Sequence, residues 1–284
     1  MKLYRIKDQA LLHLDGQFYL SPALESWHGL INRNDLHNYL KDRKNDWEVM
    51  PDHFLDTEKA VAPPVDPHQE VWAAGVTYLR SKVARMEESE QTGGAVFYNL
   101  VYDAERPELF FKSMGYRVRG HHQPIQIRPD STWDVPEPEL TLFITRDQRI
   151  VAYTIGNDVS SRSIEGENPL YLPQAKVYDG SAAVGPCLWV PESPIPMNSQ
   201  IKITITRGDQ VLYEDSVEIN MMKRRHLELS EFLFRAHSFD KGVFLMTGTC
   251  LVPDHTFTLR ENDVVTISVD HIGTLINQVK NNIQ

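Results

Sequence analysis

The side chains best suited to chemistry in this 284-residue chain are carboxylates near the start of one predicted strand and just past the next. Glu137 and Glu139 stand two residues apart in the segment 135–144. Side chains of a strand alternate between its faces, so both carboxylates point to one side, where two anions repel unless a cation lies between them. Asp158, in the segment 155–162, would supply a third carboxylate from the next strand. This all-oxygen set would suit a hard ion such as Mg²⁺ better than zinc. A solvated Glu-x-Glu pair on a strand surface is the alternative, and such pairs are common in proteins.

Short strands and a few helices must position these carboxylates. Residues 10–20 predict a hairpin that turns at Asp15-Gly16, because Asp-Gly between apolar runs favours a tight turn. Apolar runs predict further strands at 71–76, 140–146, 150–156, 200–206, 211–219 and 263–269. Capping residues and helical spacing predict helices at 34–41, 79–91 and 230–237. The chain is therefore expected to be a strand-rich α+β protein.

A proline-rich stretch divides the chain unequally. Residues 61–67, Val-Ala-Pro-Pro-Val-Asp-Pro, lack a helical or strand period and are expected to be a linker. We therefore predict a small N-terminal α+β domain over 1–66 and a catalytic domain over 67–284.

Composition excludes several classes of protein. Hydrophobic residues make up 41% and charged residues 24%, which is ordinary for a globular chain, and the formal net charge is −10. No basic surplus exists to neutralise phosphates, so nucleic acid is not an expected partner. The chain shows neither an apolar run of membrane-helix length nor a signal-peptide core, so no membrane association is expected. Cys187 and Cys250 lie far apart and are expected to be free thiols in the cytoplasm.

The motifs around the carboxylates resemble those of the fumarylacetoacetate hydrolase superfamily. Glu137-Pro-Glu-Leu140 resembles its Glu-x-Glu-Leu strand, and Asn157-Asp-Val-Ser-Ser-Arg162 resembles its Asn-Asp-Val-Ser-x-Arg segment. Other matching segments follow in family order, namely Gly75-Val-Thr-Tyr78, Pro107-Glu-Leu-Phe-Phe-Lys112, Lys176, Thr247-Gly-Thr249 and Asn262-Asp-Val-Val265. The resemblance runs from about residue 70 to the C-terminus.

This resemblance implies a fold, an assembly and a set of site residues. The fold would be the mixed β-roll of the family with a small N-terminal domain, in a homo-oligomer. Glu137, Glu139 and Asp158 would hold Mg²⁺, with Mn²⁺ or Ca²⁺ as alternatives. Lys176 would add positive charge beside the metal and bind the carboxylate or developing enolate of the substrate. Thr249 would bind a substrate carboxylate.

The chain departs from the family at the residues that activate water. Hydrolases of the superfamily usually show Gly-x-Asn-Tyr-x-x-His-x-x-Glu, whose His and Glu activate the attacking water. The same stretch begins here at Gly75 and holds Ser81 at the His position and Ala84 at the Glu position. Serine without a partner is no base near neutral pH, and alanine has no titratable group. Water activation is therefore missing while the metal motif is intact.

A narrower resemblance accounts for this departure. Four segments resemble the sugar-acid branch of the superfamily, which includes 2-keto-3-deoxy-D-arabinonate dehydratases: 72–78, 84–89, 106–110 and 164–174. The resemblance implies Glu108 as the general base, with Glu87 and Glu88 as alternatives. A salt bridge to Arg106 or Lys112 is the structural alternative for Glu108.

Basic and hydroxyl side chains near the family blocks are candidates for substrate binding. Arg80, Arg85 and Lys112 are expected to include one or two cations that face the pocket, because a guanidinium fork suits a carboxylate. Ser81 and Thr249 complete the predicted substrate-binding set. Solvation of the protein surface is the alternative for the basic residues.

The sequence thus favours a Mg²⁺-dependent dehydratase of a 2-keto-3-deoxy sugar acid. A proton would leave C3, the metal would stabilise the enolate, and the C4 hydroxyl would leave as water, so no step needs an activated water. One alternative is a carbon–carbon bond hydrolase of an acylpyruvate or a fumarylacetoacetate-like diketo acid. Another is a non-catalytic metabolite-binding module that kept the family pocket.

Overall fold

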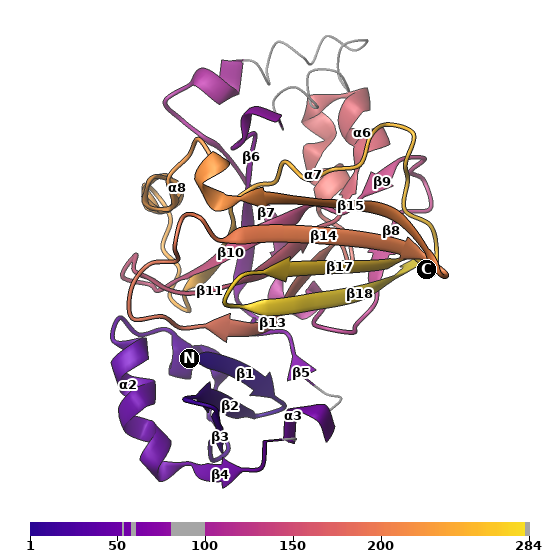
Figure 1. Cartoon of the computed structure of the whole chain (residues 1–284). Coiled ribbons are helices and arrows are strands. Elements are labelled where there is room, and N and C mark those ends of the chain that lie inside the picture. The colour runs from indigo at the N-terminus through magenta and orange to yellow at the C-terminus, as the bar shows by residue number, and fades with distance from the viewer. Residues whose placement is uncertain (53, 58–60, 81–99, 282–284) are drawn as a thin grey trace.

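The computed structural model describes residues 1–52, 54–57, 61–80 and 100–281, and all structural statements below concern these ranges. Its main element is an 11-stranded sheet in the order β4-β3-β2-β1-β13-β11-β10-β16-β6-β7, with β5 pairing β1 (Figure 1). Its strands are β1 (Lys2–Ile6), β2 (Gln9–Leu14), β3 (Gln17–Leu20), β4 (Glu48–Met50), β5 (Val61–Ala62), β6 (Glu70–Gly75), β7 (Glu108–Met114), β10 (Pro138–Ile144), β11 (Ile150–Asp158), β13 (Ala182–Trp189) and β16 (Val243–Met246).

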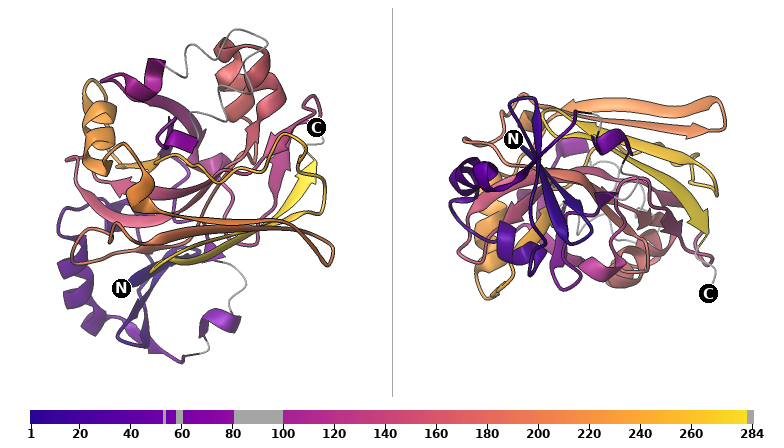
Figure 2. Two further views of the ribbon diagram at one scale, coloured as in Figure 1. Left: turned by 45° about the horizontal axis from the view of Figure 1, so that its top comes forward. Right: turned by 90° about the horizontal axis from the view of Figure 1, so that it is seen from below.

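A second sheet of five strands packs on the first. Its order is β15-β14-β17-β18-β8, and its strands are β8 (Ile125–Ile127), β14 (Gln200–Arg207), β15 (Gln210–Glu218), β17 (Val264–Val269) and β18 (Gly273–Asn281). Figures 1 and 2 show this sheet lying across the larger one. Leu142 and Ile155 from the large sheet share one buried cluster with Ile203 and Ile267 from the smaller sheet. Apolar side chains from the facing sides of the two sheets therefore form the main core.

Helices are short and lie around the sheets. They are α1 (Trp27–Ile31), α2 (Leu36–Arg43), α3 (Phe54–Thr57), α6 (Arg162–Glu167), α7 (Leu172–Lys176) and α8 (His226–Phe234), with 3₁₀ turns η1 (Lys44–Asp46), η2 (Gly115–Arg117), η3 (Pro169–Tyr171) and η4 (Ile219–Met221). The strands β9 (Asp134–Val135) and β12 (Ser160–Ser161) form a two-stranded ribbon beside α6 and α7. No helix in the described ranges has the length and apolar character needed to cross a bilayer.

The predicted strands agree closely with the observed ones. The prediction of strands at 140–146 and 150–156 is confirmed by β10 and β11, which pair antiparallel with Leu140 opposite Ile155. Every residue of β10 is buried, because β11 and β16 flank it and both of its faces are covered. The hairpin at Asp15-Gly16 is confirmed as the connection from β2 to β3, and both residues have positive φ.

One predicted helix was wrong in its boundaries. The helix expected at 230–237 is α8, which begins four residues earlier, at His226. There the backbone N–H of Arg225 donates to Oε2 of Glu228 at 3.3 Å. The stretch expected to be a linker contains the two-residue strand β5, whose Ala62 pairs with Arg5 of β1. Of the helix expected at 79–91, residues 79 and 80 are helical and the rest lies outside the described residues.

The N-terminal residues are tied closely to the rest of the molecule. Strand β1 pairs with β13, with Leu3 opposite Leu188, so the large sheet runs through both predicted domains. Figure 1 shows this indigo part at the lower end, continuous with the sheet above it. The division at residue 66 stays a prediction, since both parts share one sheet and both hydrophobic clusters.

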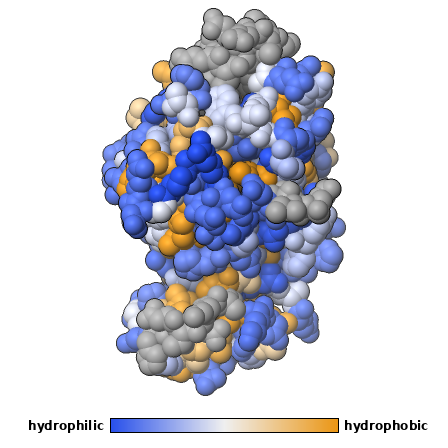
Figure 3. All heavy atoms as spheres, turned by 90° about the vertical axis from the view of Figure 1, so that its right-hand side faces the viewer, coloured by the Kyte–Doolittle hydropathy of each residue, from blue (hydrophilic) through white to orange (hydrophobic). Residues whose placement is uncertain are grey.

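The outer surface agrees with the charged composition. The face in Figure 3 is mostly hydrophilic, and hydrophobic residues appear there in small separate areas. This agrees with the packing of apolar side chains between the two sheets.

Candidate active site

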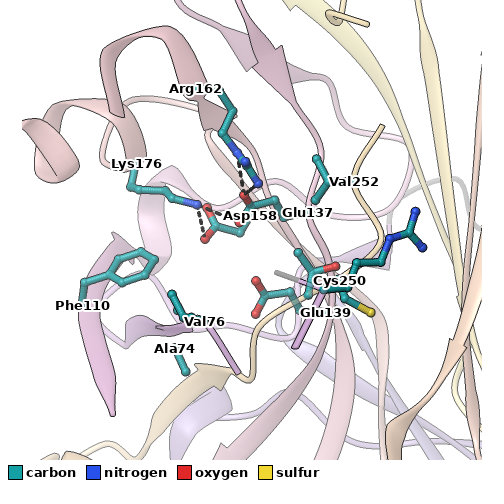
Figure 4. Close-up of a pocket in the computed structure, with 13 residues that line it drawn as sticks. Ala74, Val76, Phe110, Glu137, Glu139, Asp158, Arg162, Lys176, Cys250 and Val252 are labelled. Atoms are coloured by element: carbon teal, nitrogen blue, oxygen red, sulfur yellow. Dashed lines mark hydrogen bonds and ion pairs between the residues drawn. The ribbon is translucent and has the colours of Figure 1, made fainter. Parts of the chain in front are cut away.

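Three carboxylates meet where β10 begins and β11 ends. Glu137 directly precedes β10, Glu139 is its second residue, and Asp158 is the last residue of β11. Antiparallel pairing holds the strands in register, and the backbone N–H of Asp158 donates to the carbonyl of Glu137 at 3.0 Å. One oxygen from each carboxylate lies within 4.8 Å of the others, and all three residues are at most 3% exposed. This carboxylate triad is the cluster that the Glu-x-Glu spacing predicted (Figure 4).

Two cations bind the first carboxylate of the triad. Arg162 donates from Nη2 and Nε to Oε1 of Glu137, at 2.7 and 3.2 Å. Lys176 donates from Nζ to Oε2 of the same residue at 2.7 Å. Arg162 begins α6 and Lys176 ends α7, so these two short helices carry the cations to the triad. Figure 4 shows both side chains converging on Glu137.

Two lysines share the carboxylate of Asp158. Lys176 Nζ lies 3.3 Å from Oδ2, and Lys112 Nζ lies 2.5 Å from Oδ1. Lys176 also donates to Ser160 Oγ at 2.5 Å. Burial alone would raise the pKa of Asp158, but the two ammonium groups outweigh this and hold the pKa below its ordinary value. Asp158 therefore stays ionised inside the protein.

Glu139 has a different environment from the other two carboxylates. Burial, together with the charges of Asp158 and Glu137, raises the pKa of Glu139 well above its ordinary value. Its Oε2 accepts a hydrogen bond from the backbone N–H of Gly248 at 2.5 Å. A divalent cation among these oxygens would offset the repulsion, and the hard oxygen donors fit Mg²⁺. The residues present thus fit the metal that the sequence predicted.

Gly248 has to be glycine for this hydrogen bond to form. Its φ of +94° lies in the left-handed region, and a Cβ would collide with Thr77 Oγ1 and the carbonyl of Ala74. Thr77 in turn donates to the carbonyl of Thr247 at 2.8 Å. The Thr-Gly-Thr segment therefore packs against the residues after β6 and aims a backbone N–H at the triad.

A cavity opens over the triad. Besides the triad, Arg162 and Lys176, the cavity is lined by Ala74, Gly75, Val76, Arg80, Phe110, Thr249, Cys250 and Val252. Phe110 places its ring 5.5 Å from Lys176 Nζ, which shields that ammonium from water. An apolar wall beside a cluster of charges is the usual form of a site for a small anionic molecule.

Thr249 and Arg80, two of the predicted substrate-binding residues, line this cavity. Thr249 is 8% exposed, and its Oγ1 accepts from the backbone N–H of Leu251 at 3.1 Å, so it also closes a turn. The guanidinium of Arg80 forms an ion pair with Asp215 of β15 at 2.8 Å, and its side chain is 60% exposed. The predicted roles of both residues stay predictions.

Glu108, the predicted base, lies beside the cavity. It is opposite Gly75 in the pairing of β7 with β6, and a Cβ at Gly75 would collide with the carboxylate of Glu108. Because Gly75 lines the cavity, the carboxylate lies at its border. This position is compatible with the predicted role and does not test it.

The structure does not place the other residues that were predicted to bind substrate or act as a base along the cavity. Lys112 is fully buried behind Asp158 and is not among the described residues that line the cavity. Ser81 and Arg85 lie outside the described residues, as do Ala84 and the alternative bases Glu87 and Glu88.

Arg162 and Phe110 were not assigned a role from the sequence. Arg162 is the last residue of the Asn-Asp-Val-Ser-Ser-Arg motif, so the signal for it was present in the quoted string. Phe110 belongs to the segment 106–110, where its alternation with Glu108 places both side chains on one face of β7. Its place beside Lys176 depends on how β7 packs against α7.

Comparison with known proteins agrees with this geometry. Residues 71–280 match the model of the fumarylacetoacetate hydrolase C-terminal family. The chain is 45% identical over 250 residues to a probable 2-keto-3-deoxyxylonate dehydratase of Haloferax volcanii, covering 88% of this chain and 84% of that protein. It is 39% identical over 237 residues to a 2-dehydro-3-deoxy-D-arabinonate dehydratase of Saccharolobus solfataricus, covering 83% and 79%.

A solved structure extends the likeness over the whole chain. A 2-keto-3-deoxy-D-arabinonate dehydratase complexed with magnesium and 2,5-dioxopentanoate is 33% identical, with a TM-score of 0.83 and full coverage of both chains. The predicted mixed, strand-rich α+β fold is confirmed by this likeness. By its motifs, its fold and the match over residues 71–280, the chain belongs to the fumarylacetoacetate hydrolase family.

Proposed function

We propose that this protein is a Mg²⁺-dependent dehydratase that removes water from a 2-keto-3-deoxy sugar acid. The observation that carries the proposal is the buried triad of Glu137, Glu139 and Asp158 beside the ammonium group of Lys176. The two relatives named as dehydratases, at 45% and 39% identity, support the reaction class.

The proposed substrate has five carbons. The two relatives are named for xylonate and arabinonate derivatives. Xylonate and arabinonate of the same D or L series differ in configuration only at C2 and C3. Their 2-keto-3-deoxy derivatives have a ketone at C2 and a methylene at C3, so both names describe one compound. Loss of one water from it gives 2,5-dioxopentanoate, the molecule found with magnesium in the similar structure.

The triad holds the metal in this proposal. Mg²⁺ bound by Glu137, Glu139 and Asp158 would supply a Lewis acid for the 2-keto oxygen of the substrate. Mn²⁺ and Ca²⁺ are alternatives, since both accept oxygen donors. Lys176 places a second positive charge beside the triad, aimed at negative charge that develops on the substrate.

Glu108 is the proposed base for the proton at C3. Its carboxylate lies at the border of the cavity, beside Gly75. Removal of that proton places electrons between C2 and C3, and the C4–O bond then breaks with loss of hydroxide, which leaves as water. Transfer of a proton from C5 to C3 then gives an enol between C4 and C5. Transfer of the C5 hydroxyl proton to C4 completes the tautomerisation to the 2-keto acid with an aldehyde at C5. Phe110 excludes water from Lys176, and Thr249 is proposed to bind the C1 carboxylate.

A comparison of two substrate classes tests the proposal. Purified protein with Mg²⁺ should convert a 2-keto-3-deoxypentonate to a product lighter by one water, with an aldehyde proton in the ¹H NMR spectrum. It should leave acylpyruvates essentially uncleaved, because general base catalysis contributes about 10²–10⁴-fold and the usual water-activating pair is replaced by Ser81 and Ala84. Cleavage of acylpyruvates without any dehydration would overturn the dehydratase and favour the hydrolase.

We further propose that the protein acts in the cytoplasm as a homo-oligomer. Cys187 and Cys250 are buried free thiols, which suits a reducing compartment. The oligomer is expected from the family resemblance. Light scattering on the eluted protein tests it, and a mass of one chain at micromolar concentration would contradict it.

A further inference from the structure

Lys112 has a position that substrate binding does not explain. It belongs to β7, and its side chain has no exposed surface. Its Nζ donates to the carbonyls of Val159 and Lys176 at 3.0 and 2.6 Å, and lies 2.5 Å from Oδ1 of Asp158. Two of the three N–H donors of this ammonium group go to the backbone carbonyls, and its charge pairs with the carboxylate of Asp158.

These contacts place Lys112 behind the wall of the active site. Asp158 and Lys176 line the cavity, whereas Lys112 is not among the described residues that do. The side chain contacts a proposed metal ligand directly and holds the backbone carbonyl of the proposed catalytic lysine. It therefore ties together the end of β11 and the end of α7, which lie 18 residues apart in sequence.

A lysine in this environment is costly for the fold. Burying an ammonium group is unfavourable unless it is paired and hydrogen-bonded, and replacing a buried ion pair with apolar residues is often neutral or stabilising. Stability alone therefore gives little reason for a buried lysine at this place. Orientation of a metal ligand does give one, because partners of metal ligands fix their direction.

We propose that Lys112 is a positioning residue, which acts through Asp158 and the backbone of Lys176 and does not touch the substrate. The inference rests on the proposed function, in that Asp158 is taken as a metal ligand and Lys176 as a catalytic group. It replaces the expectation from sequence that Lys112 faces the pocket.

The kinetics of Lys112→Met distinguish a positioning role for Lys112 from substrate binding and from a purely structural role. Loss of a positioning contact should lower kcat about 10–100-fold, the usual effect of removing a partner of a metal ligand. KM for the keto acid should stay within about threefold of the wild-type value. When chemistry is slow, KM approaches the dissociation constant of the keto acid, which a residue that does not touch the substrate should leave unchanged. Lys202→Met, the same substitution at an exposed lysine of β14, should leave both values unchanged.

Each other kinetic result counts against the proposal. A KM raised about tenfold or more would mean that Lys112 binds the substrate. Unchanged kcat and KM, with only a lower melting temperature, would mean that Lys112 is structural.

A double variant tests the contact with Asp158 without any assay of activity. Lys112→Met leaves the carboxylate of Asp158 with Lys176 as its one ammonium partner among the described residues, and Asp158→Asn removes the charge that is then less compensated. The double variant Lys112→Met/Asp158→Asn should therefore melt at a higher temperature than Lys112→Met, and should fold even where the single variant does not. Effects that simply add, or failure of both variants to fold, would overturn the proposal.

The two proposals fail in different ways. If the wild type does not dehydrate any keto acid, the proposed function fails, and the melting temperatures still decide whether Lys112 acts through Asp158. If the wild type is active but the two substitutions do not couple, only the role of Lys112 fails.

Discussion

Carboxylates are buried against cations in two separate regions of this protein, around Asp263 and around the triad. Arg207 donates from Nε and Nη2 to the two oxygens of Asp263, at 2.7 and 2.9 Å, as a one-to-one fork between β14 and the turn before β17. At the triad, Lys176 divides its donors between Glu137 and Asp158, and each of these carboxylates has a second cation. One cation therefore binds one carboxylate at Asp263, whereas in the triad one cation is shared between two carboxylates. We call the first arrangement a closed pair.

The difference indicates what each region does. A bidentate pair satisfies both partners and holds two segments together. In the triad, Glu139 has two anionic neighbours and accepts a backbone N–H, and burial with these charges raises its pKa. A cluster that needs a further positive charge is suited to bind a metal ion, whereas a closed pair is suited to stabilise a fold.

The largest effect expected from this comparison is loss of turnover in the triad. Glu139→Gln and Asp158→Asn should each lower kcat by about 10³-fold or more, because the metal contributes several kcal/mol of charge stabilisation. EDTA should silence the wild type, and added Mg²⁺ should restore it. Full activity of protein stripped of divalent ions would refute the metal site.

The same substitution at Glu139 that abolishes turnover should not lower thermal stability. In EDTA, Glu139→Gln should melt at or above the temperature of the wild type, because it removes one of three neighbouring carboxylates. A clearly lower melting temperature would mean that the repulsion at Glu139 is already offset in the metal-free protein.

The next effect concerns the shared cation. Lys176→Met should lower kcat about 10²–10³-fold, as expected for loss of one preorganised electrostatic contact. The fold should survive, because Glu137 keeps Arg162 and Asp158 keeps Lys112. Steady-state kinetics and a thermal melt check both statements, and activity above about a third of wild type would remove Lys176 from the mechanism.

The pair of Arg207 and Asp263 should affect stability and not turnover, which is the opposite of Lys176. Arg207→Ala removes two hydrogen bonds from the buried carboxylate of Asp263, which keeps the backbone N–H of Arg260. The free energy of unfolding should fall by about 1–3 kcal/mol, because Oδ1 of Asp263 then loses its donor. kcat should stay unchanged at a temperature where the variant is folded. Urea denaturation and kinetics measure the two quantities, and a loss of kcat without a loss of stability would contradict the comparison.

The last effect is confined to acid pH and concerns a titratable group with no ionic partner among the described residues. Burial lowers the pKa of His226, at the start of α8, to about 4. The unfolded chain takes up this proton near pH 6.5, so the contribution to stability is complete above that pH and is lost as the pH falls toward 4. His226→Gln should therefore lose about 1–3 kcal/mol less than the wild type between pH 7 and pH 4. Parallel pH profiles of unfolding for the two proteins would contradict the shift.

The carboxylate triad could be predicted from the sequence because its geometry is local. Glu137 and Glu139 share a face by the alternation of β10, and Asp158 ends the adjacent strand of the same hairpin. The motifs also led to the family, the dehydratase chemistry and the metal, which the comparisons with known proteins support. The roles assigned to Glu108, Lys176 and Thr249 stay proposals.

The place of Lys112 behind the triad could not be predicted, because it depends on packing between segments far apart in the chain. Whether Lys112 faces the cavity or the interior depends on how β7 packs against the end of β11 and α7, and alternation along β7 does not decide this. The joining of β1 to β13 likewise pairs residues far apart in the chain, such as Leu3 with Leu188. Local periods determine which side chains share a face of a strand. Only the tertiary structure decides which face is buried and which charges meet there, because burial and Coulomb energies depend on distance in space and not on separation in sequence.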